Sequence, residues 1–281
     1  MSNQCDIQIN PDIIGIGVRI SLYILSLAGP ILSLFSASDA LLRSIETSMG
    51  LTGLAVLLTT FVYSGEKTLD LFHALCIFHL VGLAGVSIRP KRDVRQKQIT
   101  QAIFEVVYLG GTLGLLIFMI SVFARAKSFG PKPQCNDGVM YVMFGVNVSA
   151  INPTFRALFL ANFALMLVGL PVSYLVWSAR KERYCSDEEE FAGIRVMSDV
   201  AGRCYLIAML ELMIKRNNTT SDGSDWSFGQ ILAMMMLLGP LIEFVSAFFK
   251  DGNQDDDGKK SGKLLSNQFV NVVQVGSSSS N

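Results

Sequence analysis

The sequence predicts an all-α membrane protein, a polytopic seven-transmembrane-helix bundle with its amino terminus outside and its carboxyl terminus in the cytoplasm. Hydrophobic residues make up 51% of the 281 residues and charged residues only 16%. Charged residues account for about 25% of an ordinary soluble domain. Apolar windows also recur along the chain, each near the roughly 20 residues that a membrane-spanning α-helix needs.

The apolar windows place the spans one by one. The sixth is the least apolar, because charged residues such as Asp199 and Arg203 precede its apolar part. Taken alone, this segment fits an interfacial or re-entrant helix as well as a spanning one. The predicted spans are 13–36, 48–64, 70–88, 102–124, 157–178, 194–214 and 229–249.

Basic residues give the orientation. Five of them follow the third span, and such clusters stay in the cytoplasm. Seven spans also divide Lys and Arg between the two sides more unequally than six spans do. The acceptor Asn147-Val148-Ser149 then lies outside, so Asn147 is a predicted glycosylation site, and the overlapping acceptors at Asn217 and Asn218 lie outside close to the membrane. The basic cluster is Arg89, Lys91, Arg92, Arg95 and Lys97.

The same topology predicts a disulfide between Cys5 and Cys135. Both lie outside, where an oxidising compartment permits a bridge between the amino-terminal tail and the loop after the fourth span. Cys185 falls on the cytoplasmic side and is expected to stay reduced, whereas Cys76 and Cys204 lie within spans as small core residues.

Two regions follow from these assignments. Residues 1–250 form the transmembrane domain, and residues 251–281 form a cytoplasmic tail rich in Asp, Gly and Ser. That composition is typical of disorder, and the tail is a possible contact for a cytoplasmic protein partner.

Charged residues inside the predicted spans are the main functional signal, because a charge in a helix centre costs at least a few kcal/mol. Helices rise about 1.5 Å per residue, so depth can be estimated from sequence. This estimate pairs Arg203 with Glu243 between the sixth and seventh spans, and it brings Arg19 and Glu211 to similar depths in the outer half. An ion path, a proton relay, a polar ligand site and structural ion pairing all fit the pattern. The candidate buried polar site is Arg19, Glu211, Arg203, Glu243 and His79.

Prolines and histidines within the spans have ordinary explanations as well as functional ones. Gly29-Pro30, Pro171 and Gly239-Pro240 predict bends, which either shape the bundle or mark discontinuous helices around a site. His73, Cys76 and His79 are spaced by three residues and spiral around a helix, so they favour core histidines with partners over a metal site.

Three stretches of the chain resemble a large group of uncharacterised fungal multi-span membrane proteins, common in mushroom-forming species. The resemblance covers nearly the whole chain up to about Lys250, implies a shared topology and implies no activity. The stretches are Cys5 with Asn10-Pro11-Asp12 and Gly15-Ile16-Gly17-Val18-Arg19; Cys135 with Tyr141-Val142-Met143-Phe144-Gly145-Val146-Asn147-Val148 and Asn152-Pro153; and Glu211-Leu212-Met213-Ile214 with Trp226 and Phe228-Gly229-Gln230-Ile231-Leu232.

These observations favour a non-enzymatic, receptor-like or sensing protein of the plasma membrane or secretory pathway, with the lipid bilayer as its first partner. The sequence has no phosphate-binding loop and only two histidines, so no cofactor is expected. Zero net charge gives no indication of nucleic-acid binding. The alternatives are a transporter or channel, and an intramembrane enzyme of lipid or terpenoid metabolism that uses Glu211, Glu243 and His79 for acid–base work.

Overall fold

A computed structural model describes residues 5–34, 38–85, 98–180, 192–217, 219 and 226–251, and the chain is predominantly helical, as the sequence predicts. The predicted tail from residue 252, the basic cluster at 89–97, Cys185 and Asn218 lie outside the described residues. The helices are α1 (Pro11–Ile14), α2 (Ile16–Leu34), α3 (Asp39–Gly65), α4 (Leu71–Leu83), α5 (Gln98–Ala124), α6 (Pro153–Arg180), α7 (Ala192–Arg216), α8 (Phe228–Met235) and α9 (Leu238–Asp251). Two 3₁₀ helices, η1 (Ala126–Ser128) and η2 (Pro133–Gly138), precede the strands β1 (Met140–Met143) and β2 (Val146–Ser149).

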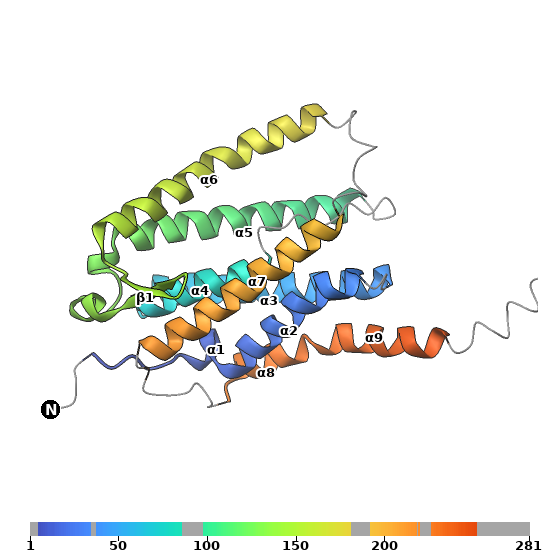
Figure 1. Ribbon diagram of the computed structural model, residues 1–281, viewed down its shortest axis with the longest axis horizontal. Helices are drawn as coiled ribbons and strands as arrows, with labels where there is room; N and C mark the ends of the chain where they lie inside the picture. Colours follow the sequence, from blue (N-terminus) through green and yellow to red (C-terminus); the bar gives the residue numbers. More distant parts are fainter. Residues whose placement is uncertain are drawn as a thin grey trace, which may run out of the picture.

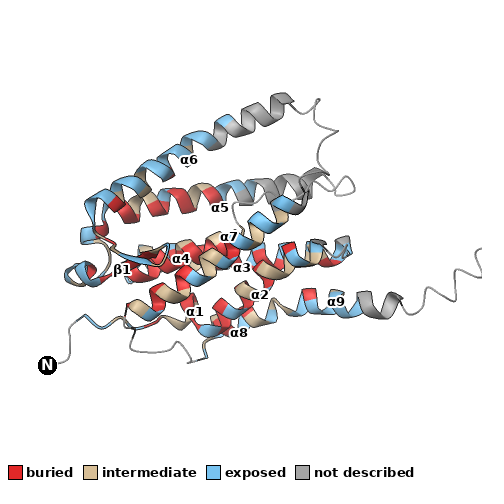
Figure 2. Cartoon of the chain, in the orientation of Figure 1, coloured by how far each residue is buried: buried red, intermediate tan, exposed pale blue. Residues whose placement is uncertain are grey.

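The long helices lie roughly side by side, with α4 at the centre (Figure 1). Helix α4 contacts α1, α2, α3, α5 and α7, and nearly all of its side chains are buried (Figure 2). Helix α6 packs mainly on α5, and α9 packs on α3, so both lie at the periphery. The core therefore surrounds α4, and the outer helices expose most of their side chains.

Three helical stretches in the described part of the chain are long and apolar enough to cross a membrane. They are Pro11–Ser33, Ala40–Gly65 and Phe228–Ser246. Helix α4 has 13 residues, which gives a length of about 20 Å, less than the roughly 30 Å of a bilayer's hydrocarbon core. Large aliphatic side chains are exposed on the outer helices, including Leu58, Leu165 and Val168.

The predicted span 48–64 is too short, because α3 begins at Asp39. The Ser38 hydroxyl caps the helix by accepting a hydrogen bond from the Leu41 amide at 3.3 Å. Leu41, Ile45 and Met49 follow at four-residue spacing and form a small buried cluster with Leu25. Polar residues on the other face of these first turns lower the mean hydropathy, so a hydropathy window misses them.

The least apolar predicted span, 194–214, is one continuous helix, α7, from Ala192 to Arg216. Asp199 and Arg203 lie one turn apart on it and form an ion pair at 3.0 Å. Because Asp199 and Arg203 are partners on the same helix, their charges support the helix instead of interrupting it.

Two of the predicted spans consist of two helices each. The first is divided at Gly15, between α1 and α2, and the last is divided at Met236 and Leu237, just before Gly239-Pro240. Pro30 lies inside α2 without ending it, and the backbone of α6 stays helical through position 171. A discontinuous helix therefore occurs near one of the three prolines.

A β-hairpin in the loop after α5 was not predicted. Strands β1 and β2 pair antiparallel, with Tyr141 opposite Val148. Phe144 and Gly145 form the turn, with φ angles of 50° and 78°, which is the positive-φ conformation of a tight hairpin turn. The hairpin lies beside α7, where Asn217 pairs with both the amide and the carbonyl of Met140.

Candidate functional site

The amino-terminal segment is fastened to the rest of the bundle at several points. Cys5 and Cys135 form the predicted disulfide, with Cα atoms 5.3 Å apart. The Asn10 amide donates to Nε2 of His73 at 2.9 Å, and His73 Nδ1 pairs with Asp70 at 2.7 Å. These contacts fix the position of the residues that enter α2.

The start of α2 is held against α8. The Gly17 amide donates to Oε1 of the buried Gln230 at 2.9 Å, and Oδ1 of Asp12 accepts from the Gly229 amide at 3.1 Å, at the first turn of α8. A Cβ atom at Gly15 would lie 2.2 Å from the Pro11 carbonyl oxygen and 2.5 Å from the Gln230 side chain, so the break between α1 and α2 requires glycine there. The break between α1 and α2 thus forms part of a defined contact.

This arrangement directs Arg19 toward α7. Arg19 Nη1 forms an ion pair with Oε1 of Glu211, and Arg19 Nε donates to the Ile14 carbonyl at 3.0 Å. The Tyr23 hydroxyl donates to the same Glu211 oxygen at 2.7 Å. Arg19 and Glu211, which the sequence places at similar depths, are therefore partners across the α2–α7 contact.

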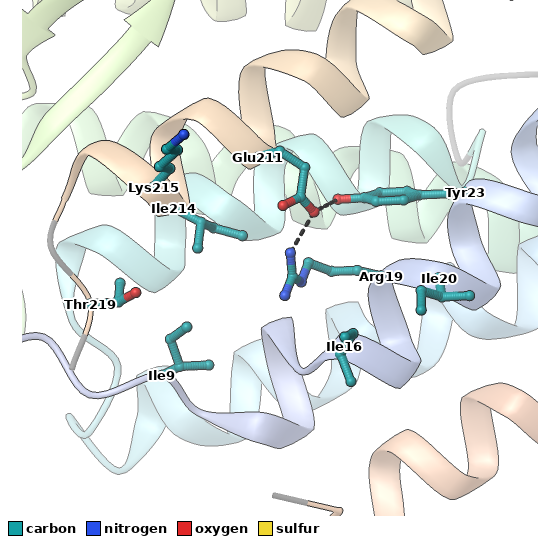
Figure 3. A pocket seen from close by; sticks show the side chains of 9 residues that line it. All are labelled: Ile9, Ile16, Arg19, Ile20, Tyr23, Glu211, Ile214, Lys215 and Thr219. Carbon is teal, nitrogen blue, oxygen red and sulfur yellow. Dashed lines mark hydrogen bonds and ion pairs between the residues drawn. The ribbon is translucent and has the colours of Figure 1, made fainter. Parts of the chain in front are cut away.

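The Arg19–Glu211–Tyr23 group lies in an open cleft of about 650 Å³ between α2 and α7 (Figure 3). The Arg19 side chain is 10% exposed, whereas the Glu211 side chain is 44% exposed. The other side chains around the cleft are four isoleucines, a lysine and a threonine: Ile9, Ile16, Ile20, Ile214, Lys215 and Thr219. The cleft thus combines a buried cation with an aliphatic wall.

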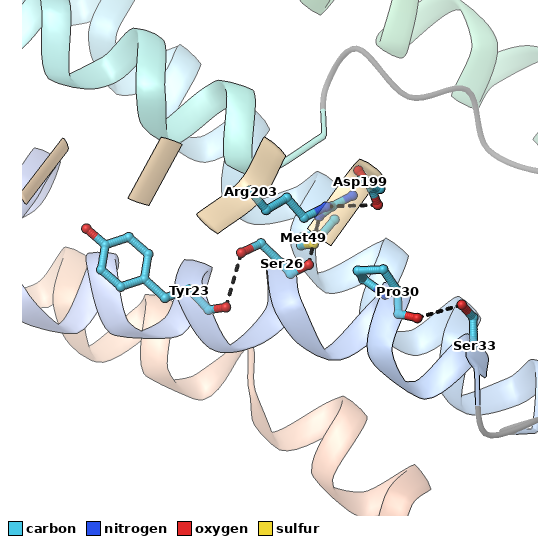
Figure 4. Close-up of polar contacts among 7 residues, drawn as sticks. All are labelled: Tyr23, Ser26, Pro30, Ser33, Met49, Asp199 and Arg203. Atoms are coloured by element: carbon cyan, nitrogen blue, oxygen red, sulfur yellow. Dashed lines mark hydrogen bonds and ion pairs between the residues drawn. The ribbon is translucent and has the colours of Figure 1, made fainter. Parts of the chain in front are cut away.

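Arg203 lies elsewhere on α7 and does not pair with Glu243. Its Nε donates to Oδ2 of Asp199 at 3.0 Å, and its Nη1 donates to the Ser26 carbonyl at 2.9 Å (Figure 4). The Ser26 carbonyl is free to accept this bond because of Pro30. A helical carbonyl normally accepts from the amide N–H four residues later, and proline has no amide N–H. The predicted Arg203–Glu243 pair is therefore wrong: the guanidinium binds a carbonyl of α2 and the Asp199 carboxylate, one turn earlier on α7.

Glu243 and His79 are also separate from the cleft. Glu243 is on α9, which packs on α3. His79 is buried in α4 and stacks on Tyr141, with ring centroids 5.5 Å apart, and neither ring nitrogen has a hydrogen-bond partner within the described chain. Burial raises the pKa of the neighbouring Tyr141 hydroxyl, which keeps it neutral.

Of the five residues of the candidate polar site, the structure brings together only Arg19 and Glu211. Because His79 has no polar partner, the described residues do not assemble Glu211, Glu243 and His79 into one acid–base set. They also contain no group of three or more His, Cys, Asp or Glu side chains that could hold a metal ion. His73 has the partners expected of a core histidine, and His79 does not.

The two described glycosylation acceptors differ in their surroundings. Asn147 is exposed on β2, where its Oδ1 accepts from Arg216 at 2.6 Å. Asn217 is buried, and its Nδ2 donates to the carbonyls of Met140 and Met213 at 2.7 and 2.8 Å. A glycan on that nitrogen would displace at least one of these bonds, so the structure favours Asn147.

Sequence reasoning did not identify Tyr23, Lys215 or Thr219 as part of the site. A signal for the first two was present, because Tyr23 follows Arg19 by four residues and Lys215 follows Glu211 by four. Residues at this spacing lie on the same face of a helix. Thr219 follows the end of α7, so its position depends on the loop.

Comparison with known proteins adds no relative. No protein-family model, curated protein or solved structure matches this chain.

Proposed function

We propose that this chain is a seven-span membrane protein, with its amino terminus outside and its carboxyl terminus in the cytoplasm, that acts as a receptor-like sensor through the cleft between α2 and α7. The observation that carries the proposal is the Arg19–Glu211 ion pair, which joins the two helices at the edge of an open cleft. A ligand that competes for Arg19 changes the contact between α2 and α7. If α2 and α7 have two arrangements, the ligand favours the one that it binds more tightly. The size of the shift is set by the difference between its affinities for the two arrangements.

Three features support the membrane setting. Three helical stretches have the length and composition to cross a bilayer. Aliphatic side chains such as Leu165, 72% exposed, point away from the core, where water would disfavour them and lipid would not. The Cys5–Cys135 disulfide lies at the end of the bundle that the topology assigns to an oxidising compartment.

Orientation is tested in cells with the Asn147 acceptor, and the Asn217 acceptor serves as a control. Asn147→Gln is expected to abolish a glycan-dependent shift in electrophoretic mobility. Thr219→Ala removes only the Asn217 acceptor and is the matched control, expected to leave the shift unchanged. A tag on the carboxyl terminus should resist external protease until the membrane is permeabilised; digestion in intact cells contradicts the proposed orientation.

The sensing role is tested by crosslinking the full chain and a form lacking residues 252–281 to cytoplasmic proteins. A partner that depends on the tail, and whose recovery changes in Glu211→Gln, supports sensing through the cleft. Ion or solute flux in liposomes that contain only this protein contradicts it.

A transporter or channel is the second candidate, and the two divided helices favour it. The α1–α2 and α8–α9 pairs are both discontinuous, and α8 contacts both α1 and α2. Discontinuous helices that meet near polar groups are typical of substrate sites in secondary transporters. Flux that is lost in Glu211→Gln or Glu243→Gln would establish this function; flux that both variants leave unchanged would exclude these acids from the pathway.

A further inference from the structure

We propose that the cleft between α2 and α7 binds an amphiphile with one anionic head group, a phosphate or a carboxylate, on an aliphatic chain. The inference rests on the proposed sensing function and specifies the class of ligand that the same cleft accepts.

The Arg19 guanidinium supplies the head-group site. Arginine has five N–H donors in a planar fork. Nε binds the Ile14 carbonyl and Nη1 binds Glu211, while Nη2 has no acceptor in the part of the chain that the structure describes. The guanidinium projects into the space beside Ile9 and Ile214 (Figure 3). The fork geometry of arginine matches the oxygens of a carboxylate or a phosphate.

The charge of the cleft selects an anion. Arg19 and Lys215 are positive and Glu211 is negative, so the charged groups that line the cleft sum to one positive charge. Lys215 is exposed, and no acidic side chain in the described part of the chain forms an ion pair with it. The hydroxyl of Thr219 lies at the same end of the cleft as Lys215 and Ile9 (Figure 3). A bound oxyanion would therefore contact the buried guanidinium of Arg19, with the Lys215 ammonium group and the Thr219 hydroxyl at the edge of the cleft.

The isoleucines supply the site for the chain of the ligand. Ile16 and Ile20 line the cleft from α2 and are 38% and 41% exposed, so they leave apolar surface uncovered by protein. Residues 16 to 23 of α2 extend about 10 Å along the helix at 1.5 Å per residue. That length suits a short alkyl chain whose head group lies beside Arg19.

The direct test is equilibrium binding of octyl phosphate to the full chain in bilayer discs of uncharged lipid, with empty discs subtracted. Octanol and inorganic phosphate serve as competitors that carry only one half of the proposed ligand. Octyl phosphate is expected to bind at least tenfold more tightly than either. Equal affinity for octanol overturns the head-group site, and equal affinity for inorganic phosphate overturns the amphiphile in favour of a free anion.

Matched variants locate the site. Ile20→Trp fills the cleft and is expected to weaken binding at least tenfold, whereas Ile24→Trp, one turn further along α2 and 51% exposed but outside the cleft, is expected to leave it unchanged. Lys215→Gln is expected to weaken binding about threefold, and Lys132→Gln on the exposed loop is its control. Equal effects of Ile20→Trp and Ile24→Trp overturn the proposed location.

Arg19→Lys separates binding from folding. Lysine keeps the charge beside Glu211 but lacks the second arm of the guanidinium, so binding is expected to fall at least tenfold while the Cys5–Cys135 bridge still forms. Retained affinity in this variant overturns the role of Nη2. The topology and crosslinking experiments do not use octyl phosphate, so absence of binding refutes the ligand class without refuting a sensor, and an inverted topology refutes the sensor independently.

Discussion

Arg19 and Arg203 are both buried charged residues in the contact between α2 and α7, and they differ in the partners that their guanidinium groups have. Both residues are 8% exposed. Arg203 extends from α7 to α2, where it binds the Ser26 carbonyl and keeps Asp199 as a partner on its own helix. Arg19 extends from α2 to α7, where it binds Glu211, and its remaining amino group faces an open cleft.

This difference shows that burial of a charged side chain does not by itself identify a functional residue. Access to a cleft is more informative, because an unpaired donor beside a cleft can bind a ligand without breaking a contact, and of these two arginines only Arg19 lines the cleft between α2 and α7. By that criterion the Arg203 region is structural and the Arg19 region is the candidate site.

The largest expected effect is that of Glu211→Ala. It leaves the buried Arg19 without its charged partner, and the free energy of unfolding is expected to fall by about 3 kcal/mol, the lower end of the range for breaking a buried pair, because the Glu211 side chain is 44% exposed. Denaturant titration of the protein in detergent measures it. Arg19→Leu combined with Glu211→Ala is expected to recover part of the loss; equal losses in the single and double variants would show that the pair is not coupled.

Next in size is the coupling between Arg203 and Pro30. Arg203→Leu leaves the Ser26 carbonyl without a donor, at a cost of about 2 kcal/mol. In the Pro30→Ala background the new amide at position 30 can bond to that carbonyl, so the same substitution is expected to cost about 1 kcal/mol less. A double-mutant cycle on the free energy of unfolding measures the difference. The same cost in both backgrounds would mean that the carbonyl freed by proline is not what Arg203 satisfies.

Tyr23→Phe is expected to have a smaller effect. It removes one hydrogen bond to a charged but partly exposed carboxylate, which lowers the free energy of unfolding by about 1 kcal/mol. In the Glu211→Ala background the acceptor is gone, so Tyr23→Phe should then change stability very little. A full loss in that background would assign the effect of Tyr23 to packing instead.

The smallest expected effect is that of Glu243→Gln. Glu243 is partly exposed on α9 and forms no ion pair with Arg203, so the free energy of unfolding is expected to change by less than about 0.5 kcal/mol. Its effect should also add to that of Arg203→Leu within the same margin. Strong non-additivity would restore a link between the two residues and would weaken the contrast between the two arginine regions.

Local sequence features were enough to place most of the helices. Apolar runs located the long helices to within a few residues at most ends, and the predicted topology, which puts Cys5 and Cys135 on the same outer side, indicated the bridge between them. The first turns of α3 were missed because an amphipathic segment lowers a hydropathy average. The hairpin at Met140–Ser149 was missed because two four-residue strands give a weak signal beside long helices.

The sequence by itself predicted similar depths for Arg19 and Glu211, which the structure shows to be partners, because relative depth along a helix follows from a rise of about 1.5 Å for each residue. It could not determine which helices are neighbours or how each is rotated about its axis. Arg203 and Glu243 have compatible predicted depths, yet α9 packs on α3 while α7 packs on α2 and α4. Only the tertiary structure decided that Arg203 meets the carbonyl freed by Pro30 and that Arg19 faces a cleft, since both depend on contacts between residues 177 and 192 positions apart.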